Sequence, residues 1–163
     1  MIAFAPSHLK QITEAAEAAY PEECCGLLVG HSEPSGGRVV MRVVASPNVA
    51  KGGARDRFEV DPQVRFNVQR ALEDGPERIV GHYHSHPDHP AQPSERDLEM
   101  AWEPDLVWLI IAVENGRATE TTAHLLNRGE GRFHPMRITV GIPSALIGVP
   151  FASKEARDCV PIV

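Results

Sequence analysis

The sequence predicts an α/β protein of the α+β type, in which helices flank a curved mixed β-sheet. Strand-like apolar runs outnumber helical ones, two hairpins are indicated, and the order helix, strands, helix, strand, helix, strands is not a strict alternation. The chain has 163 residues, 42% of them hydrophobic, which suits one domain with a real core. We expect this domain to span residues 1–140 and residues 141–163 to form a C-terminal extension.

The first segments predict a helix followed by a β-hairpin. Apolar residues recur at helical spacing over His8–Ala19, where Ser7 can cap the start and Pro21 stops the helix. A short apolar run predicts a buried strand at Cys25–Val29. A valine-rich run predicts its partner strand at Arg38–Ala45.

A polar stretch and a second helix come next. Ser46–Arg55 carries the pair Gly52-Gly53 and predicts a mobile loop. Arg57–Val60 resembles a short strand. Asp61 can cap a helix that begins with proline and spans Pro62–Leu72.

The middle of the chain predicts a strand, a loop, a helix and a second strand. The strand is expected at Arg78–His84, the proline-broken loop at His86–Pro93, and the helix at Ser94–Ala101. Leu106–Val113 is the most apolar run, and we expect it to be the central strand of the sheet.

Hairpin pairing is expected after that strand. Asn115-Gly116 is the turn signal typical of a tight hairpin, and it predicts Arg117–Leu126 as the partner strand. Phe133–Val140 is a further candidate strand. We expect the remaining extension to pack on the domain or on a second subunit, which would make the protein a homodimer.

Charge and composition exclude several classes of protein. A net charge of −6 argues against a general nucleic-acid binder, and no apolar run is long enough to cross a bilayer. The N-terminus lacks the pattern of a signal peptide, and three cysteines without a Cys-x-x-Cys pair do not form a disulfide framework. We therefore expect a cytoplasmic protein.

One stretch, from Gly81 to Asp97, carries the residue types of a metal site. His84 and His86 project to one side at the end of a strand, and Asp97 lies on the first turn of the following helix. Two imidazoles and one carboxylate suit Zn²⁺ and leave the fourth tetrahedral position for water, as in catalytic zinc sites.

Hydrolysis of a peptide-type bond also needs a general base, and it benefits from a donor to the developing oxyanion. Glu23 stands before a buried strand, and Ser94 stands three residues before Asp97. By sequence alone, Glu22 and Glu23 compete about evenly for the role of base. Ser94-x-x-Asp97 equally matches a capping box, in which the serine and the carboxylate serve the helix start.

Glu23, His84-Ser85-His86 and Ser94-x-x-Asp97 together resemble the JAMM motif of the MPN-domain (Mov34/PAD-1) zinc metalloproteases, in particular their stand-alone prokaryotic members. The resemblance covers about residues 9–140 and implies the MPN, cytidine-deaminase-like architecture. It implies that His84, His86 and Asp97 bind zinc. It selects Glu23 as general base and acid, and it gives Ser94 the task of stabilising the tetrahedral intermediate.

The family resemblance also implies a substrate. Members of this family cut the bond that follows the C-terminal Gly-Gly of a ubiquitin-like or sulfur-carrier protein, by attack of a zinc-bound water. Two alternatives stay open at this point: a metal-stabilised module that binds such tails without cutting them, and a small-molecule metallohydrolase. A pure binder has no need of Glu23, and a nucleobase deaminase would need a Pro-Cys-x-x-Cys segment, which this sequence lacks.

Four further side chains have less specific interpretations. His82 is a group behind the metal ligands or, as we favour, a hydrogen-bonded core histidine. His89 is expected to be a solvated loop residue. Trp102 and Trp108 are expected in the core, and the remaining histidines, His124 among them, are assigned no role.

Overall fold

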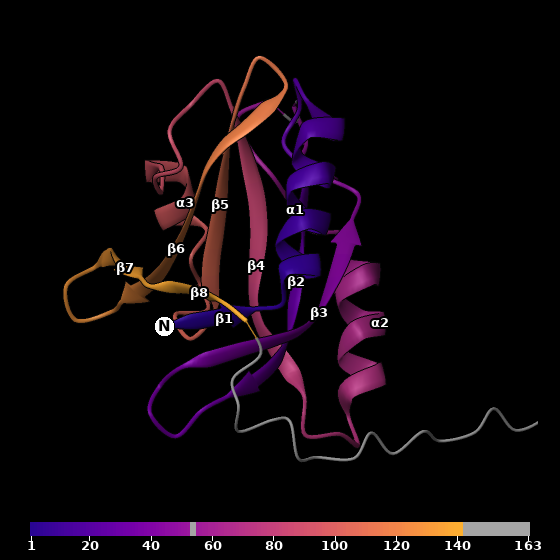
Figure 1. Cartoon of the computed structure of the whole chain (residues 1–163), viewed down its shortest axis with the longest axis vertical. Coiled ribbons are helices and arrows are strands. Elements are labelled where there is room, and N and C mark those ends of the chain that lie inside the picture. Colours follow the sequence, from indigo (N-terminus) through magenta and orange to yellow (C-terminus); the bar gives the residue numbers. More distant parts are fainter. Residues whose placement is uncertain (53–54, 142–163) are drawn as a thin grey trace, which may run out of the picture.

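The computed structural model describes residues 1–52 and 55–141, which form one eight-stranded sheet with three helices (Figure 1). The helices are α1 (Pro6–Ala19), α2 (Pro62–Leu72) and α3 (Glu95–Glu99). The strands are β1 (Ile2–Phe4), β2 (Cys25–Ser32), β3 (Arg38–Ser46), β4 (Arg78–Pro87), β5 (Val107–Glu114), β6 (Arg117–Asn127), β7 (Arg132–Met136) and β8 (Ile138–Val140).

The sheet is mixed and curved, as the sequence predicts. Its strand order is β7-β6-β5-β4-β2-β3-β1-β8. The β4–β5, β1–β3 and β1–β8 pairs are parallel, and the other neighbours are antiparallel. Only Arg137 separates β7 from β8 along the chain, yet these two strands lie at opposite ends of the order. The two ends of the sheet must therefore lie near each other, which requires strong curvature.

Successive side chains along each strand point to opposite faces of the sheet, and the two faces have different roles. One face packs against α1 and forms the main core. On β5, Leu109 and Ile111 belong to that core, whereas Trp108 and Ile110 point to the opposite face. The histidines of β4 share this opposite face with Trp108. The fold thus separates a stabilising face from a face that is free to carry a site.

The helix starts follow two different rules. Asp61 caps α2 as predicted, because its side chain accepts a hydrogen bond from the Gln63 N–H at 2.8 Å. The expected Ser7 cap of α1 is wrong. That helix begins at Pro6, and Ala5 precedes it without a side-chain cap. Proline already has the backbone angle of a first helical residue and lacks one of the N–H groups that a helix start leaves without a partner.

Three of the expected strands differ from the structure. Arg57–Val60 is not a strand and makes a single bridge, between Asn48 and Val60. The expected strand Phe133–Val140 is split into β7 and β8, which pair at opposite ends of the sheet. Leu106–Val113 corresponds to β5, which is third in the order, while β4 and β2 are the central strands. Burial by helices and loops on both faces explains why β5 is so apolar.

Two local features concern the loops around the site. The Asn115-Gly116 turn joins β5 and β6 with positive φ at both residues, which confirms the predicted hairpin. The strand β4 continues to Pro87, so His86 belongs to the strand, where it pairs with Ala112, and not to the expected loop. Both histidines of the predicted site therefore lie on one rigid strand.

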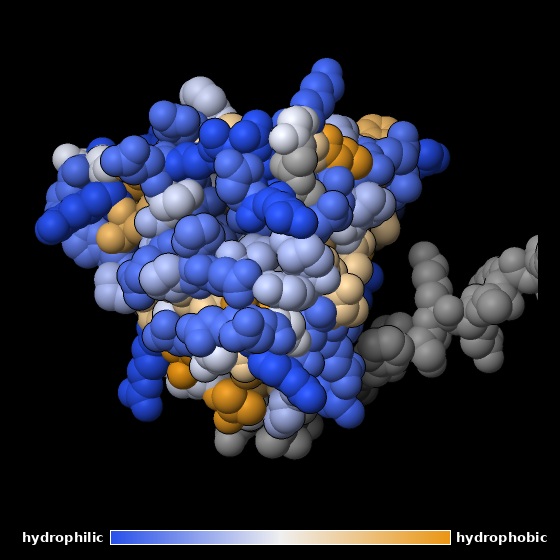
Figure 2. All heavy atoms as spheres, turned by 90° about the horizontal axis from the view of Figure 1, so that it is seen from above, coloured by the Kyte–Doolittle hydropathy of each residue, from blue (hydrophilic) through white to orange (hydrophobic). Residues whose placement is uncertain are grey.

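The surface is largely hydrophilic on the face that Figure 2 shows, with only scattered hydrophobic residues. Trp108 is buried as expected, whereas the expectation for Trp102 is wrong, because its side chain is 76% exposed. Within the described residues, none of the helices combines the length and the apolar character needed to span a membrane. The predicted C-terminal extension, beyond Gly141, lies outside the described residues.

Candidate metal centre

The strand β4 places two imidazoles side by side on the face opposite α1. His84 is fully buried and His86 is 7% exposed, and their Nε2 atoms lie 2.9 Å apart. Because both residues project from the same strand two positions apart, their separation is set by the strand itself. This geometry gives two nitrogen ligands that need no loop movement to converge.

The start of α3 supplies the third group. Asp97 is 5% exposed; its Oδ1 lies 3.3 Å from His84 Nε2, and its Oδ2 lies 3.5 Å from His86 Nε2. These three residues are the one cluster of candidate metal ligands within residues 1–52 and 55–141. Residues from two separate elements, β4 and α3, thus meet in one buried site.

Ser94 and Asp97 also form the capping box that was the alternative interpretation. The Asp97 N–H donates to Ser94 Oγ at 3.1 Å, and the Ser94 N–H donates to Asp97 Oδ2 at 2.7 Å. The Ser94 hydroxyl donates to the same Oδ2 at 2.8 Å. The cap and the ligand position are compatible, because Oδ1 of the carboxylate takes no part in the cap.

The hydrogen bond on the far side of His86 fixes its tautomer. His86 Nδ1 lies 2.9 Å from the carbonyl oxygen of Pro90. A carbonyl oxygen can only accept, so Nδ1 must carry a proton, and in the neutral ring Nε2 then keeps a lone pair that faces His84 and Asp97. Metal-binding histidines are typically oriented in this way.

The donor set fits a small divalent ion such as zinc. In a tetrahedral zinc site with bonds of ~2.0 to 2.1 Å, neighbouring ligand atoms lie about 3.3 Å apart. The two imidazole Nε2 atoms lie 2.9 Å apart, Asp97 Oδ1 lies 3.3 Å from His84 Nε2, and Asp97 Oδ2 lies 3.5 Å from His86 Nε2. These separations are close to the size that a tetrahedral zinc site requires, and nitrogen and oxygen donors are among those zinc prefers.

The charges of the cluster are arranged for a cation. Burial alone would raise the pKa of Asp97, but hydrogen bonds and charge interactions with the two histidines outweigh burial and hold this pKa well below its usual value. Burial lowers the pKa of His84, which favours the neutral imidazole. The site therefore combines a stable carboxylate with an imidazole that resists protonation.

Glu23, rather than Glu22, lies at this site. The side chain of Glu22 is exposed, whereas Glu23 is 6% exposed and lines a hollow of about 530 Å³ together with His86 and Asp97. Glu23 Oε2 is buried and has no hydrogen-bond partner among the described residues. Burial raises the pKa of Glu23 to about 8, although His86 opposes this rise.

Asn48 holds the loop that forms a wall of this hollow. Its Nδ2 donates to the carbonyl oxygens of Glu23 and Arg57, each at 3.0 Å, and its Oδ1 accepts from the N–H groups of Ala50 and Glu59. The amide thus ties the backbone of Glu23 to both ends of the loop. Sequence reasoning missed Asn48, because a single asparagine after a strand indicates only a turn.

Phe58 is a second residue that sequence reasoning missed. Its ring stacks on His84, with centroids 4.1 Å apart and an angle of 16° between the planes. His82 lies behind His84 on the strand and packs edge-on against Trp108. Its Nε2 is buried without a hydrogen-bond partner among the described residues. The packing of His82 therefore agrees with the expected core histidine, but the expected hydrogen bond at Nε2 is not found among these residues. His89 is exposed, as expected.

Comparisons with known proteins identify a matching family model and several relatives. A family model described as prokaryotic homologs of the JAB domain matches residues 5–125. The desampylase of Haloferax volcanii is 35% identical over 116 residues, which cover 69% of this chain and 78% of that protein. The CysO-cysteine peptidase of Mycobacterium tuberculosis is 28% identical over 123 residues, which cover 76% and 81%.

Solved structures show the same fold. A protein from Desulfitobacterium hafniense is similar with a TM-score of 0.75 and 27% identity, and the match covers 86% of this chain and 93% of that one. A protein from Salinibacter ruber has a TM-score of 0.68 and 33% identity, with coverage of 88% and 94%. A JAB1/MPN domain protein from Archaeoglobus fulgidus has a TM-score of 0.52 and 23% identity, with coverage of 85% and 96%, and it supports the fold alone.

The buried Glu23 predicts a specific pH dependence of stability in the metal-free protein. Its pKa rises from 4.5 to about 8 on folding, so the folded chain holds this proton more tightly than the unfolded chain. Raising the pH across that interval should destabilise the fold by up to ~1.4 kcal/mol per pH unit. Urea unfolding in the presence of a chelator should show this slope, and Glu23→Gln should reduce it. If the free energies of unfolding of the two proteins differ by the same amount at pH 5 and at pH 8, the assignment of the raised pKa to Glu23 is wrong.

Proposed function

Because this chain belongs to the family of prokaryotic homologues of the JAB domain, we propose that it is a zinc-dependent peptidase. The chain is a JAB-type hydrolase. In the proposed reaction, it hydrolyses the bond that follows the C-terminal Gly-Gly of a ubiquitin-like or sulfur-carrier protein. The observation that carries the proposal is the meeting of His84, His86 and Asp97 with the buried carboxyl of Glu23 at one hollow.

In this proposal His84 Nε2, His86 Nε2 and a carboxylate oxygen of Asp97 hold the zinc ion. When bound there, zinc supplies a Lewis acid for the scissile carbonyl and lowers the pKa of a water molecule. Each protein group has its supporting contact already: His86 bonds to Pro90, His84 stacks on Phe58, and Asp97 is held by the cap of α3. The residues are thus oriented before any ion binds.

Glu23 is proposed to move the proton. A carboxyl whose pKa is raised by burial is a better base than an exposed one, and a neighbouring positive charge draws that pKa back toward neutrality. Its unpartnered Oε2 takes a proton from the attacking water and passes it to the departing amine. One carboxyl group therefore serves both halves of the reaction.

Ser94 is proposed to stabilise the oxyanion, which requires a change of hydrogen-bond partner. In this structure the Ser94 hydroxyl donates a hydrogen bond to Asp97 Oδ2. If the hydroxyl turns to the oxyanion, Asp97 Oδ2 still accepts from the Ser94 N–H at 2.7 Å. The backbone N–H thus keeps the carboxylate in place while the side chain is released for catalysis.

The hollow beside the ligands is proposed to receive the tail of the carrier. The loop residues Ala50 and Lys51 line it on one side, and Glu99 and Met100, at the end of α3, line it on the other. Glycine residues can approach the ligands closely, because they carry no side chain that would contact these walls. Support for such a substrate comes from the relatives, which are named desampylase and CysO-cysteine peptidase.

Incubation with ubiquitin-like and sulfur-carrier proteins that bear C-terminal extensions tests this function. Intact-mass spectrometry should show removal of the residues that follow Gly-Gly, a chelator should stop the cleavage, and added zinc should restore it. Glu23→Gln should bind zinc but lose turnover. A Glu23→Gln protein with unchanged rates would exclude Glu23 as the base, and a wild-type protein that binds the carriers without cutting any of them would favour a binding module.

Ser94→Ala separates catalysis from helix capping. The loss of the cap should destabilise the protein by about 1 kcal/mol, and the loss of the oxyanion donor should lower kcat about a hundredfold or more. Asp61→Ala is the matched control, because it removes the cap of α2, outside the hollow, at a similar cost in stability. If both variants keep the same kcat, Ser94 serves the helix only.

A further inference from the structure

The loop between β4 and α3 carries backbone carbonyl groups that connect the metal ligands to strand β6. The carbonyl oxygen of Pro90 accepts the hydrogen bond from His86 Nδ1. The next carbonyl oxygen, that of Ala91, accepts a hydrogen bond from the Thr122 hydroxyl. Ala91 is fully buried and packs on Ile110. Thr122 therefore holds the loop one peptide unit away from the contact that orients His86.

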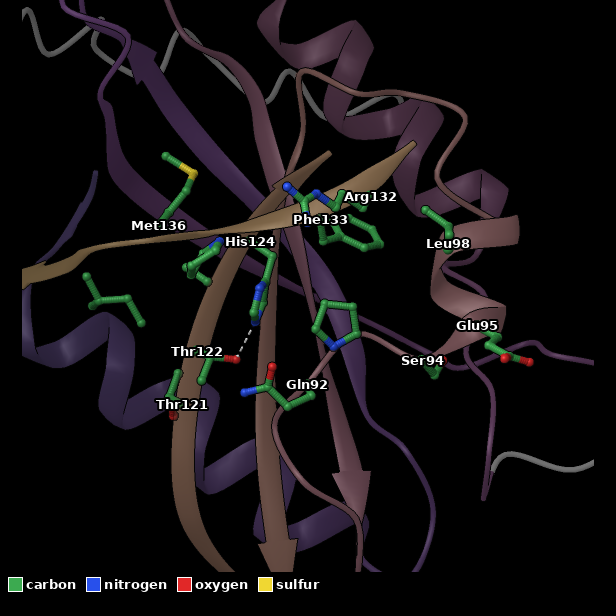
Figure 3. Close-up of a pocket in the computed structure, with 14 residues that line it drawn as sticks. Gln92, Ser94, Glu95, Leu98, Thr121, Thr122, His124, Arg132, Phe133 and Met136 are labelled. Carbon is green, nitrogen blue, oxygen red and sulfur yellow. Dashed lines mark hydrogen bonds between the residues drawn. The ribbon is translucent and has the colours of Figure 1, made fainter. Parts of the chain in front are cut away.

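The direction of each hydrogen bond in this chain follows from chemistry. Ala91 offers a carbonyl oxygen, so the Thr122 hydroxyl must donate its only proton there. That hydroxyl lies 2.9 Å from His124 Nε2, which must donate to it (Figure 3). His124 is 4% exposed, and burial lowers its pKa, which favours the neutral ring. The hydrogen bond to Thr122 then requires the proton of that ring on Nε2. The hydrogen bonds thus run from His124 through Thr122 to Ala91.

We propose that Thr122 is a positioning residue for the metal centre, with His124 as its support. The bond from Thr122 fixes the Ala91 carbonyl, and with it the neighbouring Pro90 carbonyl that keeps the His86 proton on Nδ1. His86 Nε2 then stays free to bind the ion. This inference rests on the proposed function only in that His86 is taken as a zinc ligand.

Thr122 does not line the hollow that contains the metal ligands, so its proposed role does not depend on direct contact with the metal site. Thr122 and His124 line a different hollow, of about 670 Å³, bounded by α3, β6 and β7 (Figure 3). Among the residues that line the two hollows, only Ser94 is shared. A substitution at Thr122 therefore leaves the walls of the metal hollow intact and acts through the loop.

The start of the same loop is held independently. The Asp88 N–H donates to the Val113 carbonyl oxygen at 2.7 Å, and the Asp88 carboxylate accepts from the Tyr20 hydroxyl and the Asn115 N–H. Loss of the Thr122 hydroxyl would therefore loosen the part of the loop around Ala91 without releasing Asp88. The expected effect is a displaced Pro90 carbonyl in a folded protein.

Zinc affinity tests the proposal, measured by competition with a chromophoric chelator. Thr122→Val keeps the shape and the strand propensity but removes the hydroxyl, and it should weaken zinc binding about three- to tenfold, below the range for a direct partner of a ligand. Thr122→Ser should restore binding to within about twofold. Thr121→Val is the matched control on the same strand, because the Thr121 side chain makes no hydrogen bond to any residue that the structure describes, and it should bind zinc normally.

A spectroscopic measurement distinguishes positioning from general stability. The visible bands of the Co²⁺-substituted protein should change in Thr122→Val, and the His86 Nδ1–H proton should exchange faster with solvent. Native zinc affinity together with a native Co²⁺ spectrum in Thr122→Val would overturn the proposal. If that variant does not fold, His124→Leu should weaken zinc binding in the same direction, and native affinity there would overturn the proposal equally. Failure of the unaltered protein to bind zinc would overturn the metal site itself.

Discussion

The arrangement of the site depends on the burial of one carboxylate. Asp97 is 5% exposed, and a buried carboxylate is costly unless donors or positive charge surround it. The Ser94 N–H and hydroxyl compensate one oxygen, and the other oxygen faces His84. The two neighbouring imidazoles add nitrogen donors to this carboxylate, and this set of donors suits a divalent cation. The fold thus stabilises a charge pattern that a divalent ion completes.

Backbone groups, more than side chains, keep that pattern rigid. The carbonyl oxygen of Pro90 selects the tautomer of His86, the N–H of Ser94 holds Asp97, and the carbonyl oxygen of Glu23 is tied to the Asn48 amide. Because these contacts come from a strand end, a helix start and a loop, the site integrates three separate parts of the fold. Side chains that fix this backbone, such as Thr122, influence the chemistry without touching the ion.

The sequence predicts the features that follow from local spacing. The paired imidazoles of β4, the capping box at α3 and the Asn115-Gly116 turn each depend on residues within four positions of one another. Strand β1 escaped prediction, because three residues are too few for a periodic pattern and its pairing with β3 and β8 is determined by the tertiary fold. Asn48 and Thr122 escaped for the same reason, since their partners are backbone carbonyls that no spacing rule identifies. The exposed Trp102 shows that residue type alone does not decide burial.

X-ray absorption at the zinc edge of the reconstituted protein identifies the atoms that bind the ion. We predict one zinc per chain, with two imidazole nitrogens and a carboxylate oxygen at ~2.0 to 2.2 Å and a further light-atom ligand from solvent. Sulfur at about 2.3 Å would place the ion on a cysteine instead of His84, His86 and Asp97. That result, or a spectrum with no imidazole scattering, would contradict the account.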